Sequence, residues 1–183
     1  MPVMATGGGL RFDPVERYPP GILFDLLRRS YDALVTSDPA HWLAEVARWQ
    51  AFDRDVFAHL DSIGACVFLS CADWSDGGGA IGFGSYRPRA DGSGEVGHHC
   101  IVPECRGQGY GARQLAEIVR RLRARGATSV FVTTSEHPFF APARRLYINA
   151  GFVEIGRRAG GPDPRYGLID YRLLAGHAGE PHA

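Results

Sequence analysis

The sequence contains no lysine, and all 20 of its basic residues are arginines. This absence excludes a catalytic lysine, either as a Schiff base with a carbonyl substrate or as a general base. It also excludes the Walker phosphate-binding loop, because that motif requires a lysine directly after its last glycine. A biased genome composition produces such a preference for arginine, so the preference by itself indicates no function.

A surplus of charge and long apolar runs are also missing. The 20 acidic residues balance the 20 basic ones, so no net field draws the chain to nucleic acid or to an anionic membrane. No apolar stretch is long enough to cross a bilayer. The segment MPVMATGGGL lacks the charged start and apolar run of a signal peptide. We therefore expect a cytoplasmic protein that binds neither nucleic acid nor a membrane.

Cysteine is scarce, and the four residues form two CxxxxC pairs: Cys66 and Cys71, then Cys100 and Cys105. A zinc site that combines them with His98 and His99 is one alternative. However, Cys66 and Cys71 are five positions apart, and on one strand this spacing turns the two side chains to opposite faces. Thiols stay reduced in the cytoplasm. We therefore expect free thiols and no metal site.

Apolar periodicity and turn residues predict seven strands and four helices. The strands are expected at 9–18, 65–72, 80–89, 94–102, 128–134, 152–158 and 167–174. The helices are expected at 21–35, from Pro39 with an apolar stripe that continues to Leu60, at 111–127, and at 141–149. Asp38 precedes Pro39 and is the predicted N-cap of the second helix.

This order of elements combines hairpins with strand–helix–strand crossovers. It predicts an α+β layered fold in which helices cover both faces of a mixed, mostly antiparallel sheet of about seven strands. The length of 183 residues suits one domain, so residues 1–183 are expected to form a single domain with a frayed tail at 175–183. The aromatic stripe of the second helix, which includes Trp42, Trp49 and Phe52, is expected to be core packing.

Residues 101–115 read IVPECRGQGYGARQL and join a predicted strand, a glycine-rich turn and the strongest predicted helix. Gly107, Gly109 and Gly111 allow the backbone to approach a ligand closely and to adopt positive φ. The N–H groups of such a turn and the helix dipole favour an anion such as a pyrophosphate. A tight turn that binds nothing is the alternative. The dinucleotide-binding fingerprint does not fit, because its third glycine follows the second by three positions rather than two.

The spacing of Arg106, Gly109 and Gly111 resembles the acetyl-CoA signature of the GNAT (GCN5-related) N-acetyltransferases, Arg/Gln-x-x-Gly-x-Gly/Ala. Ile101 and Pro103 stand where that family commonly has Val and Pro. A second block, PARRLYINAGF at 142–152, resembles the family pattern A-x-x-L-Y-x-x-x-G-F. The predicted order of elements also matches the family, so the resemblance implies the acyl-CoA N-acyltransferase fold. Phe140 is a departure, because the family often has at this position an Asn that contacts pantetheine.

The resemblance implies acetyl-CoA as the cosubstrate and no metal. Its pyrophosphate is expected on the glycine turn, and its pantetheine beside the strand that ends at Ile101 and Val102, where its amides can pair with an open strand edge. A bulge near Gly97 and His98 is expected to open the sheet. The expected cofactor-binding residues are Ile101, Val102, Pro103, Arg106, Gly107, Gln108, Gly109, Tyr110, Gly111 and Ala112.

The resemblance also implies three catalytic residues. Glu95 lies eleven residues before Arg106, the spacing at which the histone-acetylating branch of the family has its general base. His99 is the rival base, and its backbone N–H is the expected group that polarises the acetyl carbonyl. Tyr147 aligns with the tyrosine that protonates the leaving thiolate in many relatives. A structural role remains the alternative for each of these side chains.

These expectations describe an N-acetyltransferase that moves an acetyl group from acetyl-CoA to a primary amine within a ternary complex. The acceptor would be a small molecule or a peptide. A non-catalytic acyl-CoA-binding sensor or interaction module of the same fold is the alternative, and the resemblance also allows a homodimer. The candidates for lining the acceptor site are Trp42, Trp74, Arg87, Glu136, His137 and Tyr166.

Overall fold

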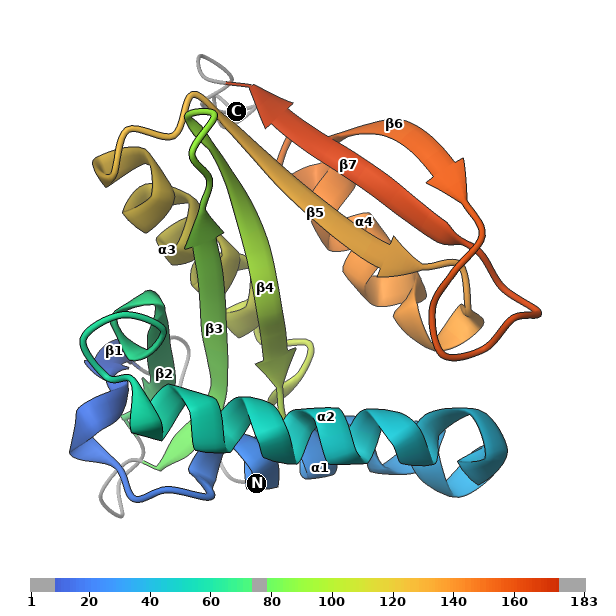
Figure 1. Ribbon diagram of the computed structural model, residues 1–183, viewed down its shortest axis with the longest axis horizontal. Helices are drawn as coiled ribbons and strands as arrows, with labels where there is room; N and C mark the ends of the chain where they lie inside the picture. Colours follow the sequence, from blue (N-terminus) through green and yellow to red (C-terminus); the bar gives the residue numbers. More distant parts are fainter. Residues whose placement is uncertain (1–8, 74–78, 175–183) are drawn as a thin grey trace, which may run out of the picture.

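A computed structural model describes residues 9–73 and 79–174, and the predicted tail and Trp74 lie outside these ranges. In the described part, seven strands form one sheet (Figure 1). The strands are β1 (Leu10–Pro14), β2 (Val67–Ala72), β3 (Ala80–Pro88), β4 (Ser93–Ile101), β5 (Ser129–Ser135), β6 (Val153–Arg158) and β7 (Leu168–Leu174). The helices are α1 (Ile22–Ser37), α2 (Pro39–Ala58), α3 (Tyr110–Ala124) and α4 (Ala141–Asn149). The predicted α+β architecture and order of elements are confirmed.

The sheet has the strand order β1-β2-β3-β4-β5-β7-β6, and only the contact between β4 and β5 is parallel. This parallel contact consists of the pairs Ser93–Ser129, Gly94–Val130 and Glu95–Phe131. Beyond Glu95 the two strands diverge, and Figure 1 shows the V-shaped opening between them. The sheet is therefore mostly antiparallel and open at its centre.

A β-bulge in β4 lies next to the last β4–β5 pair. Val96 of β4 pairs with Tyr86 of β3, and His99 of β4 pairs with Gly84 of β3. Two residues of β4, Gly97 and His98, therefore lie opposite one residue of β3, Ser85. The N–H of His98 donates to Oγ of Ser85 at 2.7 Å. This hydrogen bond holds the extra residue in place. The bulge predicted near Gly97 and His98 is thus confirmed at the point where the sheet begins to open.

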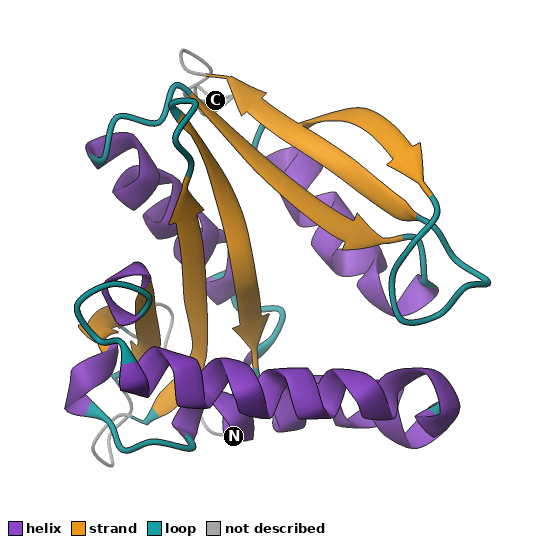
Figure 2. Ribbon diagram, viewed as in Figure 1, coloured by secondary structure: helices purple, strands orange, loops and turns teal. Residues whose placement is uncertain are grey.

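Helices cover both faces of the sheet, as predicted. One buried cluster packs α1 and α2 against β2 and β3, and includes Leu26, Trp49 and Phe83. The other packs α3 and α4 against the opposite face, and includes Ile118 and Tyr171. Figure 2 shows α2 in front of the strands and α3 and α4 behind them. The central opening therefore lies between two layers of helices.

A buried carboxylate of α2 fixes the start of α1. Asp53 is 4% exposed, and its oxygens accept hydrogen bonds from the N–H groups of Gly21 at 2.8 Å, Leu23 at 3.0 Å and Phe24 at 3.3 Å. The first N–H groups of a helix have no partner within the helix. Asp53 supplies that partner from the neighbouring helix and thereby holds α1 and α2 in register.

Three local predictions are wrong. The first strand ends at Pro14 instead of residue 18, because a short 3-10 turn occupies Val15–Arg17. Asp38 occupies the N-cap position of α2, but its side chain makes no cap hydrogen bond; it instead contacts the side chains of His41 and Arg165. The second helix ends at Ala58, and Leu60 is 40% exposed, so the apolar stripe stops before that residue.

We predict that Asp53→Ala lowers the free energy of unfolding by about 2–3 kcal/mol, because it leaves buried N–H groups at the start of α1 without an acceptor. Urea unfolding followed by circular dichroism measures the change. Asp55→Ala is the control, since Asp55 lies on the exposed side of the same helix. Equal effects of the two substitutions would contradict this role of Asp53.

Candidate functional site

The glycine turn before α3 has the predicted backbone conformation at Gly107 and Gly109, whereas Gly111 lies within α3 and does not have positive φ. Gly107 has φ +75° and Gly109 has φ +79°, in the left-handed region that favours glycine. Gly109 is the N-cap of α3 and provides no side chain to cap it. The turn therefore presents bare backbone at the positive end of a 15-residue helix.

The backbone N–H groups of this turn interrupt the hydrogen-bonding pattern of the chain. The N–H of Arg106 donates to the carbonyl of Pro103 at 3.2 Å, and the N–H of Arg113 donates to that of Gly109 at 3.2 Å. Among the described residues, the six N–H groups from Gly107 to Ala112 have no hydrogen-bond acceptor. Consecutive free N–H groups beside a helix N-terminus form an anion site. The geometry fits a diphosphate.

A cavity of about 270 Å³ adjoins these N–H groups, and we call it the phosphate cavity. Seven of the ten predicted cofactor residues line it: Ile101, Arg106, Gly107, Gly109, Tyr110, Gly111 and Ala112. Val102, Pro103 and Gln108 are not part of its wall. Residues that the sequence reasoning did not assign to the cofactor complete it: His99, Cys105, Pro142, Ala143 and Leu146.

The side chain of Arg106 has a structural task. Its Nε donates to the carbonyl of Ile101 at 2.9 Å, and an Nη donates to the carbonyl of Ser30 in α1 at 2.7 Å. The guanidinium also lies 5.8 Å from the ring centre of Phe139. Arg106 therefore ties the turn to α1 and positions the N–H groups that follow it.

A second cavity of about 290 Å³ occupies the opening between β4 and β5, and we call it the transfer cavity. It shares His99 and Ala143 with the phosphate cavity, so the two adjoin. Its wall combines α1, α2, β4, β5, α4 and the β6–β7 loop. A thioester held along β4 would reach an acceptor in this cavity.

The backbone N–H of His99 is directed toward this opening. The N–H of Val102 donates across β3 to the carbonyl of Ile81 at 2.8 Å. Because alternate residues of a strand point their N–H groups to opposite sides, those of Ile101 and His99 face away from β3. The last β5 residue paired with β4 is Phe131, opposite Glu95. The N–H of His99 therefore faces the widened part of the sheet.

The two histidine rings point to opposite faces of the sheet. His98 packs at 4.5 Å from Phe52 of α2, whereas His99 lies 6.2 Å from Tyr147 of α4 and its Nε2–H donates to the carbonyl of Gly111 at 2.9 Å. Burial lowers the pKa of each to about 4. Both rings are neutral near pH 7, and the low pKa makes His99 a weak base.

Tyr147 lies at the wall of the transfer cavity. It is 5% exposed, and burial raises the pKa of its hydroxyl. Within the described residues, that hydroxyl makes no hydrogen bond. The side chain packs 5.9 Å from Phe152 and 6.0 Å from Tyr171. A protonated phenol with no internal partner is available to donate a proton at the cavity.

Glu95 lies in the part of β4 that is still paired with β5, and it is not in the wall of the transfer cavity. It forms ion pairs with Arg87 and Arg89. Burial acts to raise the pKa of Glu95, but the hydrogen bonds from the two arginines outweigh this effect and hold the pKa below its usual value. Its position outside the transfer-cavity wall, together with these two arginine partners, weakens the case for Glu95 as a general base.

The carboxylate in the wall of the transfer cavity belongs instead to Glu45 of α2. Its side chain is 17% exposed and pairs with Arg48. Aromatic side chains surround the same cavity: Tyr31, Trp42, Trp49, Phe140 and Tyr147. The spacing 42, 45, 49 places three of these residues on one helix face. Sequence reasoning assigned that face to the core and passed over the carboxylate within it.

The other acceptor-site candidates have different positions. Trp42 lines the transfer cavity, and Arg87 lines a neighbouring cavity on the α2 face. Glu136 pairs with Arg157 and accepts the N–H of Gly167 at 3.1 Å. His137 packs on Tyr166 at 4.6 Å between ring centres and lies 6.2 Å from Trp42. Only Trp42 among these candidates is part of the transfer-cavity wall that the structure describes.

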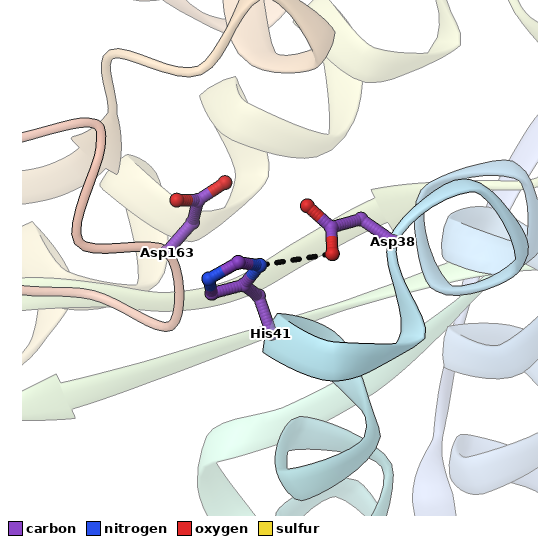
Figure 3. A group of neighbouring side chains, drawn as sticks. All are labelled: Asp38, His41 and Asp163. Carbon is purple, nitrogen blue, oxygen red and sulfur yellow. Dashed lines mark hydrogen bonds and ion pairs between the residues drawn. The ribbon is translucent and has the colours of Figure 1, made fainter.

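The four cysteines are free thiols, as predicted. Within residues 9–73 and 79–174, the one cluster of three metal-ligating side chains is Asp38, His41 and Asp163 (Figure 3). Arg165 pairs with both carboxylates of this cluster and lowers the pKa of Asp163. The cluster joins the α1–α2 corner to the β6–β7 loop, and we call it the clasp.

No helix in the described ranges combines the length and apolar character required to cross a bilayer. A comparison of the sequence with curated proteins finds no significant match. The family model described as Acetyltransferase (GNAT) family matches residues 24–152. This match spans both sequence blocks that carry the resemblance, from the strand before the glycine turn to Phe152.

Solved structures have the same fold. A protein from Desulfovibrio desulfuricans assigned to the GNAT acetyltransferases has a TM-score of 0.68 and 20% identity, over 92% of this chain and 99% of that one. The NatC complex bound to Gag peptide and CoA gives 0.64 and 13%, over 90% and 98%. A Bacillus subtilis acetyltransferase in complex with CoA gives 0.60 and 14%, over 91% and 99%.

The family match, the shared fold and the anion site before α3 agree with one another. The chain belongs to the GNAT family of acetyltransferases and is an acetyl-CoA-dependent acetyltransferase.

Proposed function

We propose that this acetyltransferase moves the acetyl group to a primary amine, by direct transfer in a ternary complex. The observation that carries the proposal is the junction of the phosphate cavity and the transfer cavity at His99. The phosphate cavity holds six N–H groups that have no acceptor among the described residues and would bind a diphosphate, and the transfer cavity holds a carboxylate among aromatic rings. The CoA bound in the NatC and Bacillus subtilis structures supports the assignment of the first.

The wall of the transfer cavity favours a cationic acceptor. Primary amines are protonated near pH 7 and carry a positive charge. The faces of Tyr, Trp and Phe rings attract such a cation, and Glu45 supplies the opposite charge. The peptide in the NatC structure supports an amine acceptor in this fold. In our proposal Glu45 binds the ammonium group and accepts its proton, the task that sequence spacing gave to Glu95.

The transfer itself forms one bond and breaks one. The neutral amine nitrogen attacks the thioester carbonyl carbon, the C–N bond forms, and the C–S bond breaks. The N–H of His99 stabilises the charge on the carbonyl oxygen, a contact worth about 3 kcal/mol. Tyr147 donates its proton to the leaving thiolate, which becomes the CoA thiol, and the proton that the nitrogen loses as the amide forms restores the Tyr147 phenol. No covalent intermediate with the protein is required, because both substrates meet in one cavity.

Gly109→Ala should weaken CoA binding at least about tenfold, because a left-handed residue with a Cβ is strained and its side chain would face the diphosphate. Isothermal titration calorimetry with CoA measures the effect. Gly92→Ala is the matched control: Gly92 has φ +80°, and a Cβ added there would meet nothing within 4 Å, as at Gly109, but it lies in the turn before β4. An equal loss of CoA affinity in both variants would exclude the turn as the diphosphate site.

Tyr147→Phe should lower kcat about a hundredfold while the CoA dissociation constant stays within threefold of the original. Because burial raises the pKa of Tyr147 above its usual value of 10, the phenol stays protonated across the neutral range. The kcat of the unaltered enzyme should therefore show no descending limb below pH 10. A fall in kcat near pH 8 would assign the general acid to another group.

Glu45→Gln should lower kcat/KM for the amine about a hundredfold, because it removes both the charge that binds the ammonium group and the base that deprotonates it. Glu95→Gln should change kcat/KM less than threefold. Release of CoA thiol from acetyl-CoA with a panel of amines measures both variants. The reverse order of effects would restore Glu95 as the base.

A further inference from the structure

A third cavity of about 690 Å³ lies on the α2 face of the sheet, beside the bulge of β4, and we call it the flank cavity. Its volume falls within the range of about 300–1,000 Å³ that is typical of small-molecule sites. Apolar side chains form most of the wall, chiefly Phe52, Ile63, Val67 and Pro88. The glycine turn contributes nothing to this wall, so the flank cavity is separate from the phosphate cavity.

The flank cavity adjoins the transfer cavity. Gly97 and His98 line both of them. Helix α2 also runs along both, because Glu45 and Trp49 lie in the wall of the transfer cavity and Phe52 lies in that of the flank cavity. The spacing of these three residues, four and then three, places them on one face of the helix. One helix face therefore contributes to the walls of both cavities.

An uncharged ring stands at the boundary. His98 packs against Phe52 at 4.5 Å and Phe83 at 5.8 Å between ring centres. Its ring makes no hydrogen bond with any described residue. Burial keeps the pKa near 4, so the ring is neutral where the enzyme works. The ring that the two described walls share therefore carries no charge.

We propose that the flank cavity binds the apolar body of the acceptor, and that the acceptor is a small amine with a body of the size of a phenylalkyl group. The ammonium group would lie at Glu45 among the rings of the transfer cavity, and the body would extend past His98 to Phe52 and Ile63. This inference rests on the proposed function, since it places the reactive nitrogen in the transfer cavity.

The clasp favours a small molecule over a polypeptide. Arg165 joins Asp38 to Asp163, and His41 contacts Asp38 at 2.9 Å (Figure 3). In the sequence, His41 directly precedes Trp42 and Asp163 directly follows Pro162, and both Trp42 and Pro162 line the transfer cavity. The α1–α2 corner is thus tied to the β6–β7 loop beside the cavity. A polypeptide acceptor would need an open path for its chain, and this bridge obstructs one side.

The test compares 2-phenylethylamine with ethylamine and with a short peptide that has a free N-terminus. We expect kcat/KM for 2-phenylethylamine to exceed that for ethylamine at least about tenfold, because a phenyl ring leaves water. Ile63→Trp fills the cavity from its rim, where Ile63 is 42% exposed. It should reduce the ratio of the two kcat/KM values at least about tenfold. Val153→Trp is the control, since Val153 is 66% exposed on β6 and should leave the ratio unchanged.

Other results would overturn the inference and separate it from the proposed function. Turnover of ethylamine with no preference for 2-phenylethylamine, or a preference for the peptide, would reject the flank cavity and keep N-acetylation. If no amine is acetylated although CoA binds, the proposed function fails. Calorimetry with 2-phenylethylamine and CoA-loaded protein then tests the cavity directly. Equal affinity in the unaltered protein and in Ile63→Trp would reject it, and thermal melting verifies that the variant is folded.

Discussion

The early end of the pairing between β4 and β5 is the constraint on which the site depends. Three residue pairs hold the strands together, and the last is Glu95–Phe131. The bulge opposite Ser85 follows at once, and the hydroxyl of Ser85 holds it through the N–H of His98. A continuous sheet would pair the N–H of His99 with β5 and fill the space between the strands. The missing pairs leave this N–H free and make room for two substrates.

Different helices line the two sides of this opening and present different groups to it. On one side, α3 begins with the glycine turn, whose N–H groups have no acceptor within the part of the chain that the structure describes. On the other, α2 presents aromatic rings and the carboxylate of Glu45. Polar contacts fix both helices: Arg106 binds carbonyls of β4 and α1, and the buried Asp53 holds the start of α1 to α2. The site is therefore positioned by side chains that do no chemistry themselves.

The sequence predicted the features that depend on residues close together in the chain. The glycine spacing gave the positive φ of Gly107 and Gly109, and the order of elements gave the sheet. Contacts between residues far apart in the sequence were not predicted. The ion pairs of Glu95 depend on which residues of β3 and its following turn stand opposite. The sequence around Glu45 did not indicate its role. A carboxylate beside aromatic residues on a helix suggests a solvent-exposed position until the neighbouring sheet is known to be open. Arg106 occupies the motif position that the sequence indicated, but its side chain donates hydrogen bonds to backbone carbonyls of β4 and α1.

The phosphate cavity adjoins the start of α3, the flank cavity lies beside α2, and no described residue lines both, so in our proposal the two substrates reach the opening by separate routes. Neither route passes through the other. If the acceptor occupies the proposed cavity, it would enter before or after CoA. Separate routes of this kind would allow a random sequential mechanism, in which either substrate binds first.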